Sequence, residues 1–194
     1  MDSPIIREAT SEDAPRVIAL EVLAFAADPP MRFLFRDPEA YLKHFPAFVD
    51  AFAGAAFEHG TAYVAGAFEG AALWLPPGVH PDDERVGAVM LEALDPAIAN
   101  DAFSVLKGMA DYHIEEPHWY LPMIGVDPSQ QGRGIGSALL RHALAKCDAD
   151  HLPAYLESSK PANIPLYERH GFRVLGEVGG GSIPVITPML RQAR

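Results

Sequence analysis

The chain has 194 residues, of which 49% are hydrophobic and 21% are charged, and its formal net charge is −11. This length suits one compact domain, 1–194, and no apolar run approaches the ~20 residues that span a bilayer. The negative charge repels polyanions, so neither nucleic acid nor a membrane is an expected partner.

The N-terminal segment lacks the features of a secretory signal. Residues 1–8 contain no basic stretch followed by an apolar run and a small-residue cleavage site. Cys147 is the single cysteine and stands in a helical pattern, which favours a buried apolar role over a disulfide. We therefore expect a cytoplasmic protein that is a monomer or a homodimer.

Apolar periodicity predicts alternating strands and helices along the chain. The first half is expected to form, in order, a short strand at 5–9, a helix over 17–24, a helix over 37–60, a hairpin of strands 61–65 and 71–75, and one or two helices between 82 and 109. The second half is expected to form a strand at 118–126, a helix after a glycine-rich loop, a strand at 154–158, a helix over 162–170, and strands near 172–178 and 183–190.

An aromatic stripe marks the predicted helix over 37–60. Phe45, Phe48 and Phe52 recur at helical spacing, which is typical of a buried face but is equally compatible with the wall of a hydrophobic pocket. Pro46 stands inside the stripe and should kink or restart the helix, because proline removes a backbone donor.

A glycine-rich loop follows the strand at 118–126. It reads Gln131-Gly132-Arg133-Gly134-Ile135-Gly136-Ser137 and runs into a helix. Glycine lets the backbone approach a phosphate closely, and the free N–H groups at a helix start attract an anion. The loop lacks the Gly-Lys-Ser/Thr ending of a nucleoside triphosphate loop, and Ser137 occupies the last glycine position of the dinucleotide pattern. The loop is therefore expected to bind the phosphate of another ligand.

Two motifs in this order resemble those of the GNAT acetyltransferase superfamily. The first is Gln-x-x-Gly-x-Gly at 131–136, preceded by a strand that ends Ile124-Gly125-Val126, and the second is the run Asn163–Phe172. Within the superfamily, the segments most similar to the puromycin N-acetyltransferase branch are 72–78, 119–126, 156–159 and 163–172. This resemblance covers about half of the chain.

The resemblance implies an α/β (α+β) fold with a mixed, mostly antiparallel central sheet, splayed between its fourth and fifth strands and flanked by helices. It also implies a core of about 117–178 that binds acetyl-CoA as cosubstrate. The implied cofactor-binding residues are Ile124, Gly125, Val126, Gln131, Gly132, Arg133, Gly134, Ile135, Gly136, Ser137, Asn163 and Tyr167. Ile124 and Val126 would pair with the pantetheine through their main chain, and the loop would hold the pyrophosphate, with Arg133 either adding charge or remaining solvated.

Transfer of an acetyl group to an amine requires a neutral amine and a proton for the departing thiolate. The resemblance makes Tyr167 the implied proton donor, since a phenol with a pKa of about 10 stays protonated at neutral pH. Glu157 and His118 are candidate general bases, with Glu116 as a third, although each also suits an ordinary polar position. His113 and His118 do not have the spacing of a metal site, so no metal is expected.

The implied function is direct acetyl transfer from acetyl-CoA to a primary amine of a small molecule, with an antibiotic-like or other hydrophobic amine as one acceptor class. Two alternatives remain open at this point. One is a non-catalytic module that binds or senses acyl-CoA, and the other is acetylation of a peptide or protein amine. The acyl-chain preference is also open.

Overall fold

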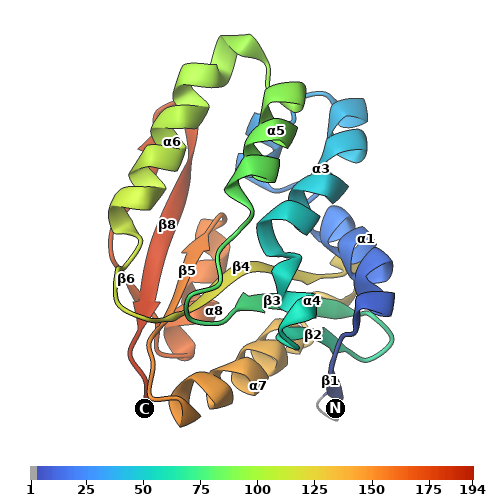
Figure 1. Cartoon of the computed structure of the whole chain (residues 1–194), viewed down its shortest axis with the longest axis vertical. Coiled ribbons are helices and arrows are strands. Elements are labelled where there is room, and N and C mark those ends of the chain that lie inside the picture. Colours follow the sequence, from blue (N-terminus) through green and yellow to red (C-terminus); the bar gives the residue numbers. More distant parts are fainter. Residues whose placement is uncertain (1–3) are drawn as a thin grey trace.

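The computed structural model describes residues 4–194 (Figure 1), and residues 1–3, part of the segment in which no secretory signal is expected, lie outside the described part. The helices are α1 (Ala14–Ala24), α2 (Pro29–Leu34), α3 (Pro38–Ala53), α4 (Ala55–Glu58), α5 (Asp83–Ala93), α6 (Ala99–Tyr112), α7 (Ile135–Ala149) and α8 (Ile164–Arg169). The strands are β1 (Ile6–Glu8), β2 (Ala62–Ala65), β3 (Gly70–Leu75), β4 (Trp119–Val126), β5 (Ala154–Ser158), β6 (Arg173–Val174), β7 (Val178–Gly180) and β8 (Ile183–Arg191). Within residues 4–194, no helix has both the length and the apolar character needed to cross a bilayer.

The strands form one mixed sheet in the order β1-β2-β3-β4-β5-β8-β6, with β7 paired to β8. The β4–β5 pair is parallel, while the other neighbouring strands run antiparallel. The predicted hairpin is present as β2 and β3. The mixed, mostly antiparallel sheet expected from the sequence is therefore confirmed.

The β4–β5 ladder is short and ends where the two strands separate. Register is recorded for Trp119 with Ala154, Tyr120 with Tyr155 and Leu121 with Leu156, although both strands continue beyond these pairs. Pro122 comes directly after the last paired residue of β4 and has no N–H to offer either neighbour. The expected splay between the fourth and fifth strands is thus observed.

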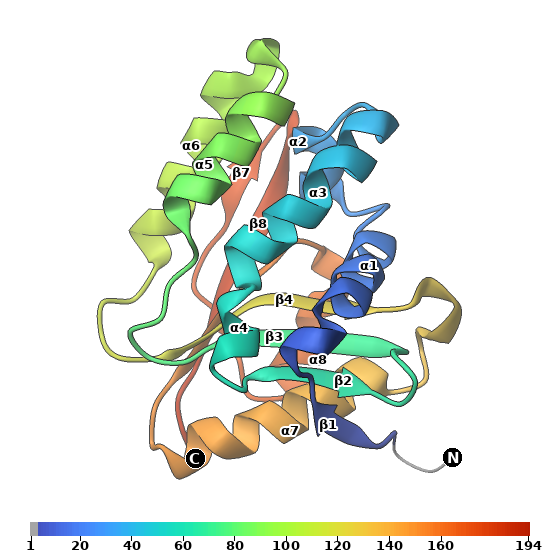
Figure 2. The same ribbon diagram turned by 45° about the vertical axis from the view of Figure 1, so that its right-hand side comes forward.

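Side chains that alternate along the strands build a core on each face of the sheet. Leu73 and Met123 point into the core that packs under α1 and α3, and Trp74 and Leu121 point into the core under α7. Figure 2 shows α1 and α3 on one side of strands β2 to β4 and α7 on the other. Helices α5 and α6 extend the structure beyond the sheet, where α5 packs on α3 and α6 on β7 and β8.

The sequence predicts a kink or a restart at Pro46, and the restart is not observed, because α3 runs uninterrupted from Pro38 to Ala53. The missing N–H of Pro46 leaves the carbonyl of Leu42 without its helical partner. Leu42 is 65% exposed, so this part of α3 faces solvent. Phe45 and Phe48, on the same helix, are buried as the aromatic stripe predicts.

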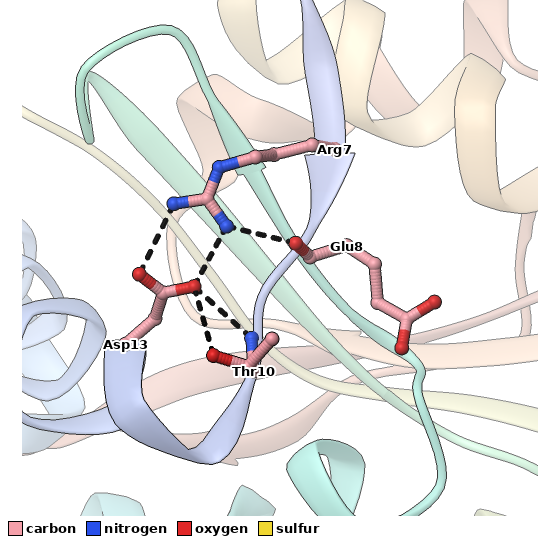
Figure 3. Close-up of polar contacts among 4 residues, drawn as sticks. All are labelled: Arg7, Glu8, Thr10 and Asp13. Atoms are coloured by element: carbon pink, nitrogen blue, oxygen red, sulfur yellow. Dashed lines mark hydrogen bonds and ion pairs between the residues drawn. The ribbon is translucent and has the colours of Figure 1, made fainter.

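A polar cluster closes the turn between β1 and α1 (Figure 3). The Arg7 guanidinium donates hydrogen bonds of 2.7 and 3.1 Å to the two carboxylate oxygens of Asp13. Asp13 also accepts from the backbone N–H of Thr10 at 3.0 Å, as in a capping box. The hydrogen bond from Arg7, followed by that from Thr10, lowers the pKa of Asp13 to about 2. The Asp13 carboxylate therefore stays ionised above that pH.

Glu21 of α1 is a carboxyl group buried without a partner. It is 0% exposed, and neither carboxyl oxygen has a hydrogen-bond partner in the described structure. Burial raises the pKa of Glu21 to about 8, so the side chain is protonated at neutral pH. It lies against Gly125 of β4, where an added Cβ would overlap with Oε2 of Glu21.

We predict that Glu21 makes the protein less stable as the pH rises from about 5 to 8. Its pKa is higher in the folded than in the unfolded chain, so the folded state holds a proton that the unfolded state releases across this range. Stability is therefore lost with rising pH, by at most about 5 kcal/mol. Chemical denaturation of the wild type and of Glu21→Gln measures this, and identical pH dependences would contradict it.

Candidate active site

A cleft of about 570 Å³ opens where β4 and β5 separate. Its wall combines the end of β4, the glycine-rich loop, the end of β5 and the start of α8, with α2, α3, α5 and α6 at the apolar end. The predicted cofactor residues found in this wall are Ile124, Gly125, Val126, Gln131, Gly132, Gly134, Ile135, Gly136, Ser137, Asn163 and Tyr167. Arg133 lies outside the wall, and its guanidinium donates to the side chain of Gln130.

The loop presents backbone donors that have no acceptor within the protein. Gly132 and Gly134 adopt φ values of +75° and +82°, and an added Cβ at either would meet no atom within 4 Å. Glycine is therefore required for its backbone conformation and not for close packing. The N–H groups of 132–137 make no hydrogen bond to another described residue. A row of unused donors at the positive end of α7 fits an anion such as a pyrophosphate.

Basic side chains gather beside this loop although the protein as a whole is acidic. Arg141 donates to Ser137 Oγ at 2.8 Å, and that oxygen lies 2.7 Å from Nε2 of His170. Burial, followed by the charge of Arg141 and of other nearby arginines, lowers the pKa of His170. Arg169 stands in the wall of the cleft. This end of the cleft is therefore electropositive, as a phosphate site requires.

Tyr167 and Asn163 lie in the cleft wall, as the spacing of one helical turn predicts. Tyr167 is 5% exposed, and burial, followed by the charges of Asp28 and Glu21, raises the pKa of its phenol. The hydroxyl therefore stays protonated throughout the neutral range and is a hydrogen-bond donor. Asn163 precedes α8 and makes no capping bond, so its amide is free to meet a ligand.

Glu157 presents a carboxyl group to the cleft from β5. The Tyr120 hydroxyl donates to its Oε2 at 2.8 Å, and Nδ1 of His113 lies 4.0 Å from its Oε1. The Glu157 side chain is 7% exposed, whereas that of His113 is 33% exposed. The structure thus holds Glu157, a predicted candidate base, in an ordered position beside Tyr120 and the imidazole of His113.

The other two candidate bases lie outside the cleft wall. The centroid of the His118 ring lies 4.8 Å from that of His113 and 5.9 Å from that of Tyr155. Its Nδ1 donates to the backbone oxygen of Glu116 at 2.7 Å, and burial lowers the pKa of its imidazole. Glu116 itself is exposed.

The sequence interpretation missed five polar residues of the cleft wall, Asp28, Gln130, Ser159, Lys160 and Arg169. In the sequence Asp28 directly precedes two prolines, which is typical of a helix boundary and gives no sign of a ligand site. The Ser159 hydroxyl donates to Asp28 Oδ2 at 2.6 Å across 131 residues of sequence. No local pattern signals this pairing, although an Asp directly before a helix that begins with proline is itself a recognisable cap.

The opposite end of the cleft is apolar. Its wall is built from side chains of four helices and of β8, namely Met31, Phe33, Phe48, Phe52, Val86, Met90, Val105, Leu106, Met109 and Ile186. The aromatic stripe of α3 is thus both core and cleft wall, since Phe45 is fully buried while Phe48 and Phe52 reach the cleft. An apolar ligand of moderate size fits such a surface.

The model of the acetyltransferase (GNAT) family matches residues 53–172, which include the splayed strands, the glycine-rich loop and α8. The chain belongs to this family. The resemblance to the GNAT superfamily is therefore confirmed, while assignment to the puromycin N-acetyltransferase branch is not shown by the matches.

Relatives with similar sequences carry acetyltransferase names. An uncharacterized N-acetyltransferase of Schizosaccharomyces pombe is 35% identical over 55% of this chain and 48% of its own length. A mycothiol acetyltransferase of Clavibacter sepedonicus is 31% identical over 47% of this chain and 31% of its own length. The chain thus spans about half the length, or less, of these curated relatives.

The architecture also matches solved structures over the whole chain. A Corynebacterium glutamicum structure, described as histone acetyltransferase HPA2 and related acetyltransferase, superposes with a TM-score of 0.72 and 26% identity, and the match covers 100% of this chain and 98% of that one. The two proteins therefore share the same overall fold.

Two other kinds of site gain no support from the geometry. Among residues 4–194, no three His, Cys, Asp or Glu side chains are grouped so as to hold a metal ion. Cys147 is 0% exposed, and burial raises the pKa of its thiol to about 12, which suits a packing role and not a nucleophile.

We predict that Gly134→Asp weakens CoA binding by about tenfold or more, because it strains a backbone at φ +82° and adds negative charge beside the free amides. Gly78→Asp is the matched control, since Gly78 has φ +81° and equally open surroundings but lies outside the cleft wall. Calorimetric titration of CoA into both variants measures the effect. Normal affinity in Gly134→Asp would remove the loop from the binding site.

Proposed function

We propose that this protein is an acetyl-CoA-dependent N-acetyltransferase that moves an acetyl group directly to a primary amine of a small, hydrophobic molecule. The observation that carries this proposal is the cleft between β4 and β5, which joins a loop of unused amides to a buried, protonated Tyr167. Family membership supports the same function, because the matched region contains β4 and β5, the glycine-rich loop and Tyr167.

Each part of the cleft has a role in this proposal. Acetyl-CoA, when bound, supplies a thioester whose carbonyl carbon is open to attack by an amine. The amides of 132–137 hold the pyrophosphate, the main chain of Ile124 and Val126 pairs with the pantetheine, and Asn163 adds a side-chain hydrogen bond. The amine nitrogen forms the new C–N bond as the C–S bond breaks.

Two side chains handle the protons of the reaction. Glu157 accepts the proton that the attacking amine releases, and its buried position next to Tyr120 keeps the carboxylate oriented toward the cleft. Tyr167 donates a hydrogen bond from its hydroxyl to the departing sulfur, which leaves as a thiolate. Because the pKa of Tyr167 is raised, a strong hydrogen bond to the thiolate is favoured over complete proton transfer. His118 lies outside the cleft wall, so it is not the direct base.

The apolar end of the cleft supports a hydrophobic acceptor. Phe48, Phe52 and Met90 present aromatic and thioether surface, and transfer of an apolar group onto such surface is favourable. Resemblance to the puromycin N-acetyltransferase branch suggests the same class of acceptor. Relatives named mycothiol acetyltransferase broaden the range of small molecules to be tested.

An acyl-CoA-binding module without an acceptor is the competing function. A thiol-release assay with acetyl-CoA and a panel of aminonucleosides, arylalkylamines, polyamines, amino acids and peptide N-termini separates the two. The proposal expects thiol release above the hydrolysis rate with hydrophobic amines. CoA affinity without release would favour the binding module, and release with peptides alone would favour acetylation of a peptide or protein amine.

We predict that Tyr167→Phe lowers kcat by on the order of 10²-fold while CoA affinity changes little, because the phenol acts on the departing thiolate and not on the bound cofactor. Tyr63→Phe is the matched control, since Tyr63 belongs to the same core under α7 but lies outside the cleft wall. Steady-state thiol release and a CoA titration give both quantities. Full turnover in Tyr167→Phe would exclude Tyr167 as the donor.

A further inference from the structure

Asp28 is a buried carboxylate at the edge of the cleft that the proposed reaction does not use. It stands between α1 and α2, is 1% exposed, and forms part of the cleft wall. Met31 and Phe33 of α2 continue the wall from this point with apolar surface. A charged group in these surroundings is shielded poorly by water, so its interactions with a ligand are strong.

Helix capping accounts for only one of the two carboxylate oxygens of Asp28. Oδ1 of Asp28 accepts from the backbone N–H of Met31 at 3.2 Å, which is an ordinary N-cap. Asp37 makes the same bond to Ala40 at 2.9 Å, also before a proline, and does so on an exposed surface. The cap therefore does not require burial. Oδ2 of Asp28 instead accepts from the hydroxyl of Ser159, a second residue of the cleft wall.

The Asp28 carboxylate has no cationic partner of its own. No Lys, Arg or His nitrogen among residues 4–194 forms an ion pair with it within 4.0 Å, although buried carboxylates are ordinarily paired. Lys160 acts on it only from a longer distance. Burial raises the pKa of Asp28, while the Ser159 and Met31 bonds and the charge of Lys160 oppose that effect.

Asp28 is a carboxyl group at this end of the cleft. Asp28 and Glu21 both raise the pKa of Tyr167, so both carboxyl groups lie near the proposed reaction centre. Glu21 has a pKa of about 8 and is protonated at neutral pH, as is the Tyr167 phenol. A cation that enters between Asp28 and Tyr167 would therefore complete an ion pair that the protein leaves open.

We propose that Asp28, together with the Ser159 hydroxyl, is the subsite that binds the ammonium nitrogen of the acceptor, and that it selects apolar primary amines over neutral molecules of the same shape. This inference rests on the proposed function, because it names the acceptor class of the same cleft. The ammonium donates to Oδ2 of Asp28 and to Ser159 Oγ, and the apolar body lies along α2 and α3. Before attack the ammonium releases one proton to solvent, and the neutral amine then gives its second proton to Glu157 as the C–N bond forms. The net charge of −11 attracts the same class of ligand from solution.

The test compares amines with the matching alcohols. Phenethylamine and 2-phenylethanol, and hexylamine and 1-hexanol, are titrated calorimetrically at neutral pH into the wild type, Asp28→Asn and Asp37→Asn, without acetyl-CoA. Asn caps helices as well as Asp does, so Asp28→Asn removes the charge and keeps the cap. Asp37→Asn makes the same change at the exposed cap. Asp28→Ser is the second variant, because Ser also caps and is neutral.

The wild type and Asp37→Asn are expected to bind each amine about tenfold or more tightly than its alcohol, and the Asp28 variants to lose that preference. A preference retained in Asp28→Asn or Asp28→Ser, or absent for both pairs in the wild type, would overturn the proposal. Thiol release is measured separately. If the wild type prefers amines but releases no thiol, the Asp28 subsite is supported and the transferase function is rejected. If thiol is released and the KM for the amine is unchanged in Asp28→Asn, the transferase function is supported and the subsite is rejected.

Discussion

The short parallel ladder between β4 and β5 is the constraint on which the site depends. Three registered pairs hold the strands together, and then Pro122 brings no donor to continue the ladder. The unsatisfied edge of β4 cannot be left to an apolar core, so it has to meet water or a ligand that pairs with it. Because the gap opens toward the start of α7 and α8, the free amides of the loop and the Tyr167 hydroxyl meet in one cleft.

Basic and acidic side chains lie at different ends of this cleft, as the proposed acyl transfer requires. Arg141 and Arg169 lie at the loop end, where an anion is expected, while Asp28 lies at the other side near Tyr167. Buried Glu21 adds no charge at neutral pH, because its pKa is about 8. It packs against Gly125 of β4, and burying a carboxyl group in this way lowers stability.

The parts that the sequence predicted well are those with a local cause. Gly132 and Gly134 were expected to open a phosphate loop, and they adopt the left-handed conformation that glycine favours. The hairpin of β2 and β3 follows from alternation and a turn. Asp28 escaped this reasoning because its cap is local but its bond to Ser159 spans 131 residues. Pro46 does not restart the helix, since α3 continues from Pro38 to Ala53.

The sequence by itself determined the glycine-rich loop, the motif from Asn163 to Phe172 and the strands of the mixed sheet. These features depend on backbone conformation and apolar periodicity, which are properties of neighbouring residues. Only the tertiary structure decided which polar groups share the cleft. It placed Glu157 in the wall and His118 behind it, and it brought Asp28 to Ser159. Burial, electrostatic environment and the distance between remote side chains arise when α1, β5 and α8 pack together, and no local pattern records them.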